Sequence, residues 1–291
     1  MIVTVKNDKL ILGVDTLGAQ MMHLQDAKGT EYLWQGDPAY WQDRSPVLFP
    51  FIGRLTENSY YLQGVKYPMT IHGFAAQQEF AVVEEGDGFV VLELTGNDST
   101  KQQYPFDFSL KIGYRLEENR LNVTYQVENR SEQVMPFGIG GHPGFNVPFV
   151  PGERFEDYEL VFCTPCQPQR LGFSPAVYLN GQDENYPLQD GTTIAMRHGL
   201  FDEDAIILRN MARAVTLHSK VSGKSLCVSY PDMPYLGIWH WPHTDAPYVC
   251  IEPWTSLPAR QDVIEELTCK SDMIQLKPGC THTTGWEVTI E

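Results

Sequence analysis

The sequence predicts an all-β protein, built as one large antiparallel β-sandwich. Short apolar or alternating runs of strand length follow one another along the chain, with turn residues between them. Only residues 258–267 have the pattern of a helix, and 24 glycines and 20 prolines interrupt the rest. Because no linker or change in composition divides the 291 residues, we expect a single domain over residues 1–291.

Seven runs carry most of this strand pattern. In chain order they are residues 9–14, 89–94, 108–114, 120–127, 205–208, 214–218 and 225–228. Turn residues at 85–88 and 117–119 join neighbouring runs at hairpin distance. A further apolar run covers residues 247–251, and we expect Pro253 to end its pairing, because proline has no N–H to donate to a neighbouring strand.

The charge and composition of the chain limit the kinds of molecule that it is expected to bind. The net charge of −16 opposes binding to nucleic acid or to an anionic membrane surface. No apolar run approaches the roughly 20 residues that span a bilayer, and no basic region with an apolar segment opens the chain. We therefore expect a cytoplasmic monomer or homodimer with a small-molecule ligand. Of six cysteines only Cys163 and Cys166 are close-spaced, which is more typical of two partly buried thiols near a turn than of redox chemistry.

His142 is the first candidate for chemistry. It lies in the segment 138–146, whose glycines give the backbone freedom and leave room beside the imidazole. A histidine there can donate or accept a proton near neutral pH, although one that only stiffens a glycine loop fits as well. Phe145, able to stack, and Asn146, able to hydrogen-bond a hydroxyl, favour a ligand site.

Glu252 is the second candidate. It follows the apolar run and precedes Pro253 and Trp254, which places a carboxylate at the end of a strand and at the rim of a cleft. Partial burial beside Trp254 would raise its pKa, as suits a general base that works near neutral pH. A structural carboxylate that accepts backbone hydrogen bonds is an equally good interpretation of this pattern.

Four further residues are weaker candidates. His72 precedes a glycine and a phenylalanine, as a site histidine does, but with less support than His142. Arg54 follows an apolar segment and a glycine, and would orient a hydroxyl or carboxylate, although an ordinary salt bridge is the commoner role. Asp202 and Asp204 precede an apolar strand; either one turns inward as a hydroxyl acceptor, or both belong to a solvated acidic turn.

Metal binding has little support in the sequence. His72, His142 and Glu252 are the residue types of a common catalytic zinc site. However, no pair of them has the local spacing that builds a chelate on a helix or a strand. We therefore expect neither a metal nor another cofactor.

Aromatic residues stand next to two of the motifs. Trp254 follows Glu252 closely, while Trp239 and Trp241 flank His240. Carbohydrate sites commonly combine aromatic faces with a few polar groups, so these tryptophans are compatible with a sugar-binding wall. We expect His240 and His243 to be surface or loop residues.

In their order and spacing, these motifs resemble the aldose 1-epimerase (galactose mutarotase-like) superfamily, most closely its LacX-like branch. They are Gly53-Arg54, Ile71-His72-Gly73-Phe74, Gly141 to Asn146, Phe201 to Ile207, and Ile251-Glu252-Pro253-Trp254. The resemblance continues to a C-terminal strand at residues 285–288 and so covers nearly the whole chain. It implies a β-sandwich of the supersandwich type that binds a hexose in a cleft on one sheet.

The resemblance also implies roles for the candidate residues. Glu252 matches the general base and His142 the general acid of the family. Arg54 and His72 match residues that position the sugar, and Asp204 fits the aspartate of the branch better than Asp202. The implied activity is the interconversion of the α and β anomers of a hexose or related sugar, without metal or cofactor.

Two other function classes remain open. The main alternative is a non-catalytic carbohydrate-binding or sensing protein with the same cleft. A glycoside hydrolase or lyase would need two working carboxylates roughly 5–10 Å apart, and the sequence offers one persuasive candidate.

The sequence differs from its relatives in the segment after His142 and around Glu252, where relatives that act on free galactose have other residues. It also has Ala76 where relatives that act on hexose 6-phosphates commonly have arginine. Neither galactose specificity nor a phosphate subsite is predicted.

Overall fold

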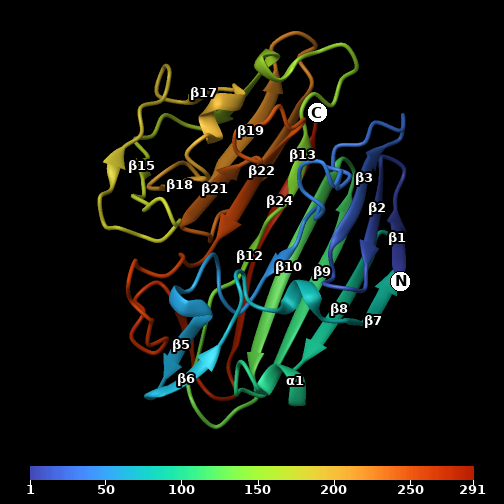
Figure 1. Cartoon of the computed structure of the whole chain (residues 1–291). Helices are drawn as coiled ribbons and strands as arrows, with labels where there is room; N and C mark the ends of the chain where they lie inside the picture. The colour runs from blue at the N-terminus through green and yellow to red at the C-terminus, as the bar shows by residue number, and fades with distance from the viewer.

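The computed structural model describes all residues from Met1 to Glu291, and two large antiparallel sheets form most of it (Figure 1). The nine-stranded sheet has the order β17 (Thr193–Ala195), β14 (Tyr158–Phe162), β19 (Ala214–Ser219), β20 (Ser225–Ser229), β24 (Thr281–Ile290), β10 (Arg120–Asn129), β9 (Phe108–Glu117), β8 (Phe89–Thr95) and β7 (Ala81–Gly86). The eight-stranded sheet has the order β16 (Glu184–Asn185), β15 (Gln169–Arg170), β18 (Ile206–Arg209), β21 (Tyr235–Trp239), β22 (Tyr248–Trp254), β12 (Gly140–Gly141) and β4 (Val47–Leu48), with β13 (Gly144–Asn146) also paired to β22.

Smaller elements surround these two sheets. They are the three-stranded sheet β1 (Ile2–Lys6), β2 (Leu10–Asp15) and β3 (Met21–Asp26), the pair β5 (Ser59–Leu62) and β6 (Val65–Pro68), and the pair β11 (Met135–Phe137) and β23 (Ile274–Leu276). The helices are short: α1 (Asp98–Lys101) and the 3-10 turns η1 (Thr56–Asn58), η2 (Ala75–Gln77), η3 (Phe155–Asp157) and η4 (His198–Phe201). None of the helices is long and apolar enough to cross a membrane.

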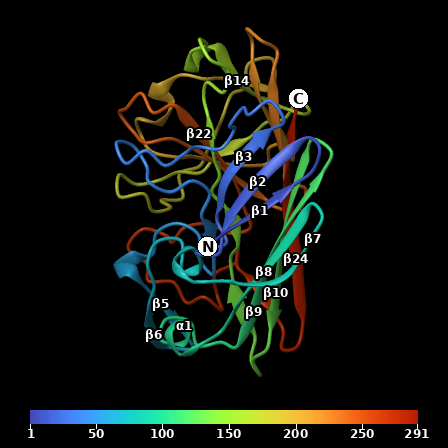
Figure 2. The same ribbon diagram turned by 90° about the vertical axis from the view of Figure 1, so that its right-hand side faces the viewer.

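The hydrophobic core lies between the two large sheets. Side chains of a strand alternate between its faces, so β10 contributes every second residue, such as Val123 and Tyr125, to a cluster of 66 buried residues. From the other sheet, Ile238 of β21 and Ile251 of β22 join the same cluster. In Figure 2, β10 and β24 stand on one side of the molecule and β22 on the other. The predicted β-sandwich is therefore confirmed.

Each of the seven predicted strands is present, with bounds that differ by a few residues at most. They correspond to β2, β8, β9, β10, β18, β19 and β20. The predicted turns close the β7–β8 and β9–β10 hairpins. Alternation predicts β9, β10 and β19 well because one face of each packs against the core while the other is more exposed.

The predicted helix at residues 258–267 is wrong. Its backbone amides donate to distant segments instead of to the preceding turn: Ala259 to the carbonyl of Arg54 at 2.9 Å, and Leu267 to the carbonyl of Tyr61 at 3.0 Å. Asp262 also has a positive φ of 59°, which no helix tolerates. Tertiary hydrogen bonds to Arg54 and to Tyr61 of β5 therefore replace the helical pattern that the local sequence favours.

The expectation that Pro253 ends pairing is also wrong, because β22 continues to Trp254. The amides of Ile251 and Thr255 donate to the carbonyls of Pro143 and Ile139, at 3.2 and 3.0 Å. The nitrogen of Pro253 faces the same side, halfway between them, and has no proton to donate. The ladder thus loses one bond on this side, next to His142, while pairing with β21 continues.

Candidate active site

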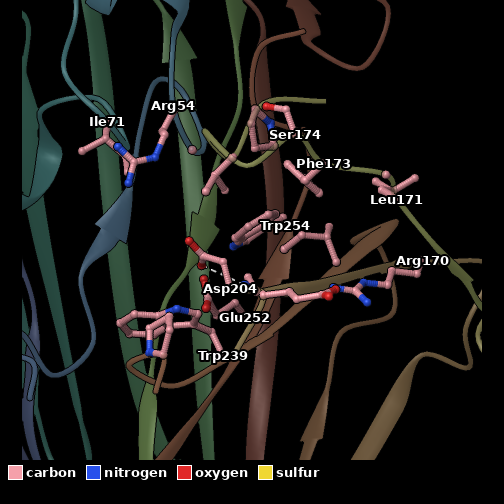
Figure 3. A pocket seen from close by; sticks show the side chains of 18 of the residues that line it. Arg54, Ile71, Arg170, Leu171, Phe173, Ser174, Asp204, Trp239, Glu252 and Trp254 are labelled. Atoms are coloured by element: carbon pink, nitrogen blue, oxygen red, sulfur yellow. Dashed lines mark hydrogen bonds and ion pairs between the residues drawn. The ribbon is translucent and has the colours of Figure 1, made fainter. Parts of the chain in front are cut away.

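A cavity of about 940 Å³ opens on the face of the eight-stranded sheet that points away from the core. It is lined by all the candidate polar residues, which are Arg54, His72, His142, Asp202, Asp204 and Glu252, and by the four tryptophans Trp41, Trp239, Trp241 and Trp254. Figure 3 shows Glu252 and Asp204 between the indoles of Trp239 and Trp254, with Arg54 and Arg170 on opposite sides of the view. Residues from widely separated parts of the sequence therefore share one cavity.

The alternation along β22 places Glu252 in this cavity. Val249 and Ile251 point into the sandwich core, so Glu252 points to the opposite face. It pairs with Gly237 of β21, where an added Cβ would lie only 3.2 Å from the Cβ of Glu252 and 3.3 Å from its Cδ. The glycine thus provides the space that the carboxyl group occupies.

His142 lies between β12 and β13, and a neighbouring loop holds its backbone. Its amide donates to the carbonyl of Pro46 at 3.1 Å. Its ring lies against Trp41, with centroids 4.8 Å apart and planes 33° apart. The glycines beside it do not adopt left-handed backbone conformations, so backbone freedom does not explain them. They instead allow neighbouring side chains to approach the backbone closely: a Cβ on Gly141 would lie 3.0 Å from the indole of Trp286.

The side chains of His142 and Glu252 contact each other at the base of the cavity. His142 Nε2 is 3.3 Å from Glu252 Oε2, and the exposed fractions of the two residues are 9% and 1%. Neither Nδ1 of His142 nor Oε2 of Glu252 completes a hydrogen bond within the protein. Buried polar atoms without partners are rare in folded proteins. Two such atoms on neighbouring side chains of one cavity therefore indicate a ligand-binding site.

Burial acts on the pKa values of this pair in opposite directions. It raises the pKa of Glu252 well above its ordinary value, and the negative charge of Asp204 adds to this rise, while the indole of Trp254 opposes it. Burial also lowers the pKa of His142 well below its ordinary value, and His72 adds to this fall. Both shifts favour a pair that holds one proton and carries no net charge.

His72 faces His142 edge-on, with ring centroids 5.5 Å apart. Its Nδ1 accepts the amide proton of Gly53 at 3.1 Å, so Nε2 carries the proton of the neutral ring. Burial and the charge of Arg54 lower the pKa of His72 to about 4. His72 is therefore a neutral hydrogen-bond donor at neutral pH.

Arg54 and the two aspartates occupy different positions on the cavity wall. Arg54 is exposed and forms no ion pair with another side chain, so its charge is available to a ligand. Asp204 accepts the amide proton of Ala205 at 2.8 Å and acts electrostatically on Glu252. Asp202 is more exposed, and its carboxylate lies 3.4 Å from His243 at the rim.

Three expectations near the site are wrong. Phe145 is fully buried in the core, and the side-chain amide of Asn146 donates to the carbonyls of Glu31 and Leu33, so neither residue faces a ligand. His240 is fully buried, because the ring contacts Phe201 with centroids 4.4 Å apart. In each case packing partners from distant segments, which the local pattern does not reveal, determine the environment.

Two parts of the cavity wall carry no signal in the local sequence. One is Trp41, which contacts the ring of His142 although the two residues lie far apart in the sequence. The other is the segment 170–184, which contributes Arg170, Phe173 and Ser174 (Figure 3). Both segments lie in loops without alternation, so only the sheet order that brings them to the cavity identifies them.

The residues best placed to hold a metal differ from the set considered in the sequence. One ligand atom each of His142, Cys250 and Glu252 lies within 4.8 Å of the other two, and all three residues are buried. His72 is not part of this group. Cys250 has the same orientation on β22 as Glu252, two residues away, which alternation along the strand explains.

Comparison with known proteins places the whole chain among similar sequences and structures. A family model described as aldose 1-epimerase matches residues 1–285. The plasmid-encoded protein LacX of Lactococcus lactis subsp. lactis is 33% identical over 299 residues, which cover 100% of this chain and 99% of LacX. A galactose mutarotase related enzyme from Lactobacillus acidophilus superimposes with a TM-score of 0.95 at 32% identity, covering 100% and 97% of the two chains. A galactose mutarotase-like protein from Lactobacillus casei gives a TM-score of 0.93 at 32% identity, with both chains fully covered.

Proposed function

The chain belongs to the aldose 1-epimerase family, and on this premise we propose that it interconverts the α and β anomers of a hexose or related sugar. The observation that carries the proposal is the buried contact of 3.3 Å between His142 Nε2 and Glu252 Oε2 at the base of a cavity lined by tryptophans. The anomeric oxygen and the ring oxygen of a sugar are bonded to the same carbon. An acid and a base in contact with each other therefore reach both oxygens at once.

In the proposed reaction, Glu252 removes the proton of the anomeric hydroxyl while His142 donates a proton to the ring oxygen. The bond between C1 and the ring oxygen then breaks, C1 rotates, and the ring closes on its other face. Ring opening converts an ionised pair into a neutral one, which is the form that burial of Glu252 and His142 favours. The reverse transfers at closure return both protons, so the enzyme is unchanged after each cycle.

The remaining polar residues of the cavity would position the sugar. His72 would donate through Nε2 to a sugar oxygen, and the unpaired guanidinium of Arg54 would hold another. Asp204 would accept a hydroxyl proton. The tryptophans would contact the apolar faces of the sugar ring.

The direct test of this function is proton exchange spectroscopy of anomeric signals. A panel of free hexoses, pentoses and hexose 6-phosphates should include at least one sugar whose α and β signals exchange faster with the enzyme than without it. If no sugar exchanges faster although binding is detectable, the proposal is wrong, and a sugar-binding or sensing protein becomes the better interpretation.

We expect the exchange rate to have a plateau that spans the ordinary histidine pKa. Because the pKa of His142 is lowered, the pair takes up a second proton only well below the ordinary histidine pKa. Because the pKa of Glu252 is raised, the pair loses its single proton only well above the ordinary glutamate pKa. The rate, after subtraction of the spontaneous reaction, should fall outside this plateau on both sides. A sharp decline near the ordinary histidine pKa would contradict the assignment of the pair.

Replacement of Gly237 by alanine is expected to slow exchange, but by less than the about 10²-fold that a displacement of about 1 Å costs a catalytic group, because its neighbours need to move by only a few tenths of an ångström. The new Cβ would lie 3.2 Å from Glu252 Cβ and 3.1 Å from Trp254 Cζ2, so both side chains must shift. Gly113→Ala is the matched control, because its Cβ in β9 would meet nothing closer than 3.8 Å. Equal rates for the two variants would show that Gly237 does not position the carboxyl group.

A further inference from the structure

The catalytic pair lies beside a buried thiol that the proposed reaction does not use. Cys250 is fully buried and packs in a small aromatic cluster with Trp34 and Tyr248. Its Sγ, one nitrogen of His142 and one oxygen of Glu252 lie within 4.8 Å of one another. We propose that His142, Cys250 and Glu252 form a binding site for Zn²⁺ or a similar thiol-preferring divalent metal ion, and that the bound ion inhibits the enzyme.

The geometry of the three groups suits tetrahedral coordination. With Zn–N and Zn–O bonds of about 2.0–2.2 Å, two ligand atoms of a tetrahedral site lie about 3.3–3.6 Å apart. The observed separation of His142 Nε2 and Glu252 Oε2 is 3.3 Å. Cys250 requires only a small movement to complete a triangle of ligands, because its sulfur is already within 4.8 Å of both other groups.

The unsatisfied polar atoms are an independent observation that points to a ligand. Glu252 is 1% exposed, and its Oε2 makes no hydrogen bond in the protein. A metal ion would satisfy this oxygen. His142 and Glu252 line the cavity whereas Cys250 lies behind them, so the fourth coordination position would face the cavity and take water or a ligand oxygen.

Charge and ligand type select the ion. Binding releases the proton of the Cys250 thiol and the single proton of the His142–Glu252 pair to solvent. The thiolate and the carboxylate then balance a divalent charge, so a buried centre without net charge results. A thiolate and an imidazole favour Zn²⁺ over Mg²⁺ or Ca²⁺, which prefer oxygen ligands.

Inhibition follows from the proposed function, on which this part of the inference rests. A metal ion bound to His142 and Glu252 occupies the nitrogen and the oxygen that would exchange protons with the sugar. Metal binding itself is independent of the reaction and is measured separately, so the two proposals fail separately.

The first test uses Co²⁺ as a spectroscopic substitute for Zn²⁺ on the reduced, full-length protein. Wild type should bind one Co²⁺ with a thiolate-to-cobalt charge-transfer band in the near ultraviolet, and Zn²⁺ should displace it. Cys250→Ala should lose this band. Its metal affinity should fall by more than the about 10–100-fold lost when a group that only supports a ligand is removed.

The other thiols supply the matched control. Cys163 and Cys166 are the only close-spaced pair, and the variant that replaces both by alanine should keep the band. Cys250→Ser serves in place of Cys250→Ala if the smaller side chain lowers the yield of folded protein. Absence of the band in wild type, or its survival in both Cys250 variants, would refute the site.

The second test measures anomeric exchange in the presence of Zn²⁺. A Zn²⁺ concentration that saturates the wild type should abolish its exchange, and a chelator should restore it. Cys250→Ala should exchange at the wild-type rate without metal and remain active at the same Zn²⁺ concentration. Equal inhibition of the two proteins would overturn the role of Cys250. A cobalt band that depends on Cys250, in a protein without anomeric exchange, would support the metal site and refute the proposed function.

Discussion

Replacement of Glu252 by glutamine is expected to slow anomeric exchange by about 10²–10⁴-fold, the usual contribution of a general base. The amide has nearly the shape of the carboxyl group but cannot accept the proton of the anomeric hydroxyl. His142→Asn should cause a loss of similar size, since the ring oxygen then has no acid beside it. Exchange spectroscopy with the best sugar of the panel measures both. Rates near wild type in either folded variant would reject the corresponding role.

The Glu252→Gln substitution should not destabilise the fold. Folding raises the pKa of Glu252, so this carboxyl favours the folded state only below its ordinary pKa and opposes folding as pH rises. Glutamine removes this effect, so the urea midpoint of Glu252→Gln at neutral pH should equal or exceed that of wild type. A lower midpoint would identify Glu252 as a structural carboxylate.

Glu265→Gln is the matched control among buried carboxylates. Glu265 accepts hydrogen bonds from the amide and the guanidinium of Arg260, at distances of 2.9–3.0 Å. Burial acts to raise the pKa of Glu265, but these hydrogen bonds and the charge of Arg260 outweigh it, so the pKa is lowered. This group stabilises the fold above its ordinary pKa, and the contribution is lost as pH falls. The Glu265 variant should therefore lose stability and keep activity, whereas the Glu252 variant should lose activity and keep stability.

Replacement of Gly73 by alanine is expected to lower the free energy of unfolding by about 2–5 kcal/mol. Gly73 has a φ of 74°, a left-handed conformation that costs alanine about 1–2 kcal/mol. An added Cβ would also lie 2.2 Å from the carbonyl oxygen of Phe49, and forced shifts of this kind cost about 1–3 kcal/mol. The obstacle is backbone, so no side chain can rotate away. Urea unfolding measures the loss.

Gly64→Ala separates these two effects. Gly64 has a similar φ of 79°, but nothing lies within 4 Å of its added Cβ. This variant should therefore lose only the about 1–2 kcal/mol of the left-handed conformation. If both variants lose the same amount, the contact with Phe49 contributes nothing. Because Gly73 follows His72, its variant should also weaken sugar binding, whereas Gly64→Ala should not.

Local sequence predicts those features of this protein that depend on the period of a strand. Alternation identified β9 and β10, because one face of each packs in the core along its whole length. The local helix signals failed for residues 258–267, where the amides of Ala259, Gln261 and Leu267 donate to the carbonyls of Arg54, Leu179 and Tyr61. A helix that is favoured locally does not form where distant carbonyls already accept its amide protons.

The candidate site divides in a similar way. His142 and Glu252 stand out in the sequence because their chemistry and their glycine or proline neighbours are unusual. Gly237 and Cys250 do not stand out, because their importance comes from strand register. Gly237 of β21 pairs with Glu252 of β22, and Cys250 lies two residues before Glu252. Trp41 contacts His142 only because the chain returns to the same cavity. These relations depend on which strands pair, which no local pattern specifies.

The missing ladder bond at Pro253 leaves His142 without a direct backbone bond to β22, the strand that holds Glu252, although Ile251 and Thr255 of that strand region bond Pro143 and Ile139 on either side of it. Glu252 is anchored in a central strand, so changes that move it also disturb the sheet. The backbone of His142 is attached to Pro46, and that of the following Gly144 to Arg44, both in a loop. Substitutions in that loop can shift the acid relative to the base while leaving the sheet intact. Under the proposed function, Arg44 and Pro46 are therefore positions at which a substitution would change the spacing of the two groups, although they lie far in sequence from Glu252.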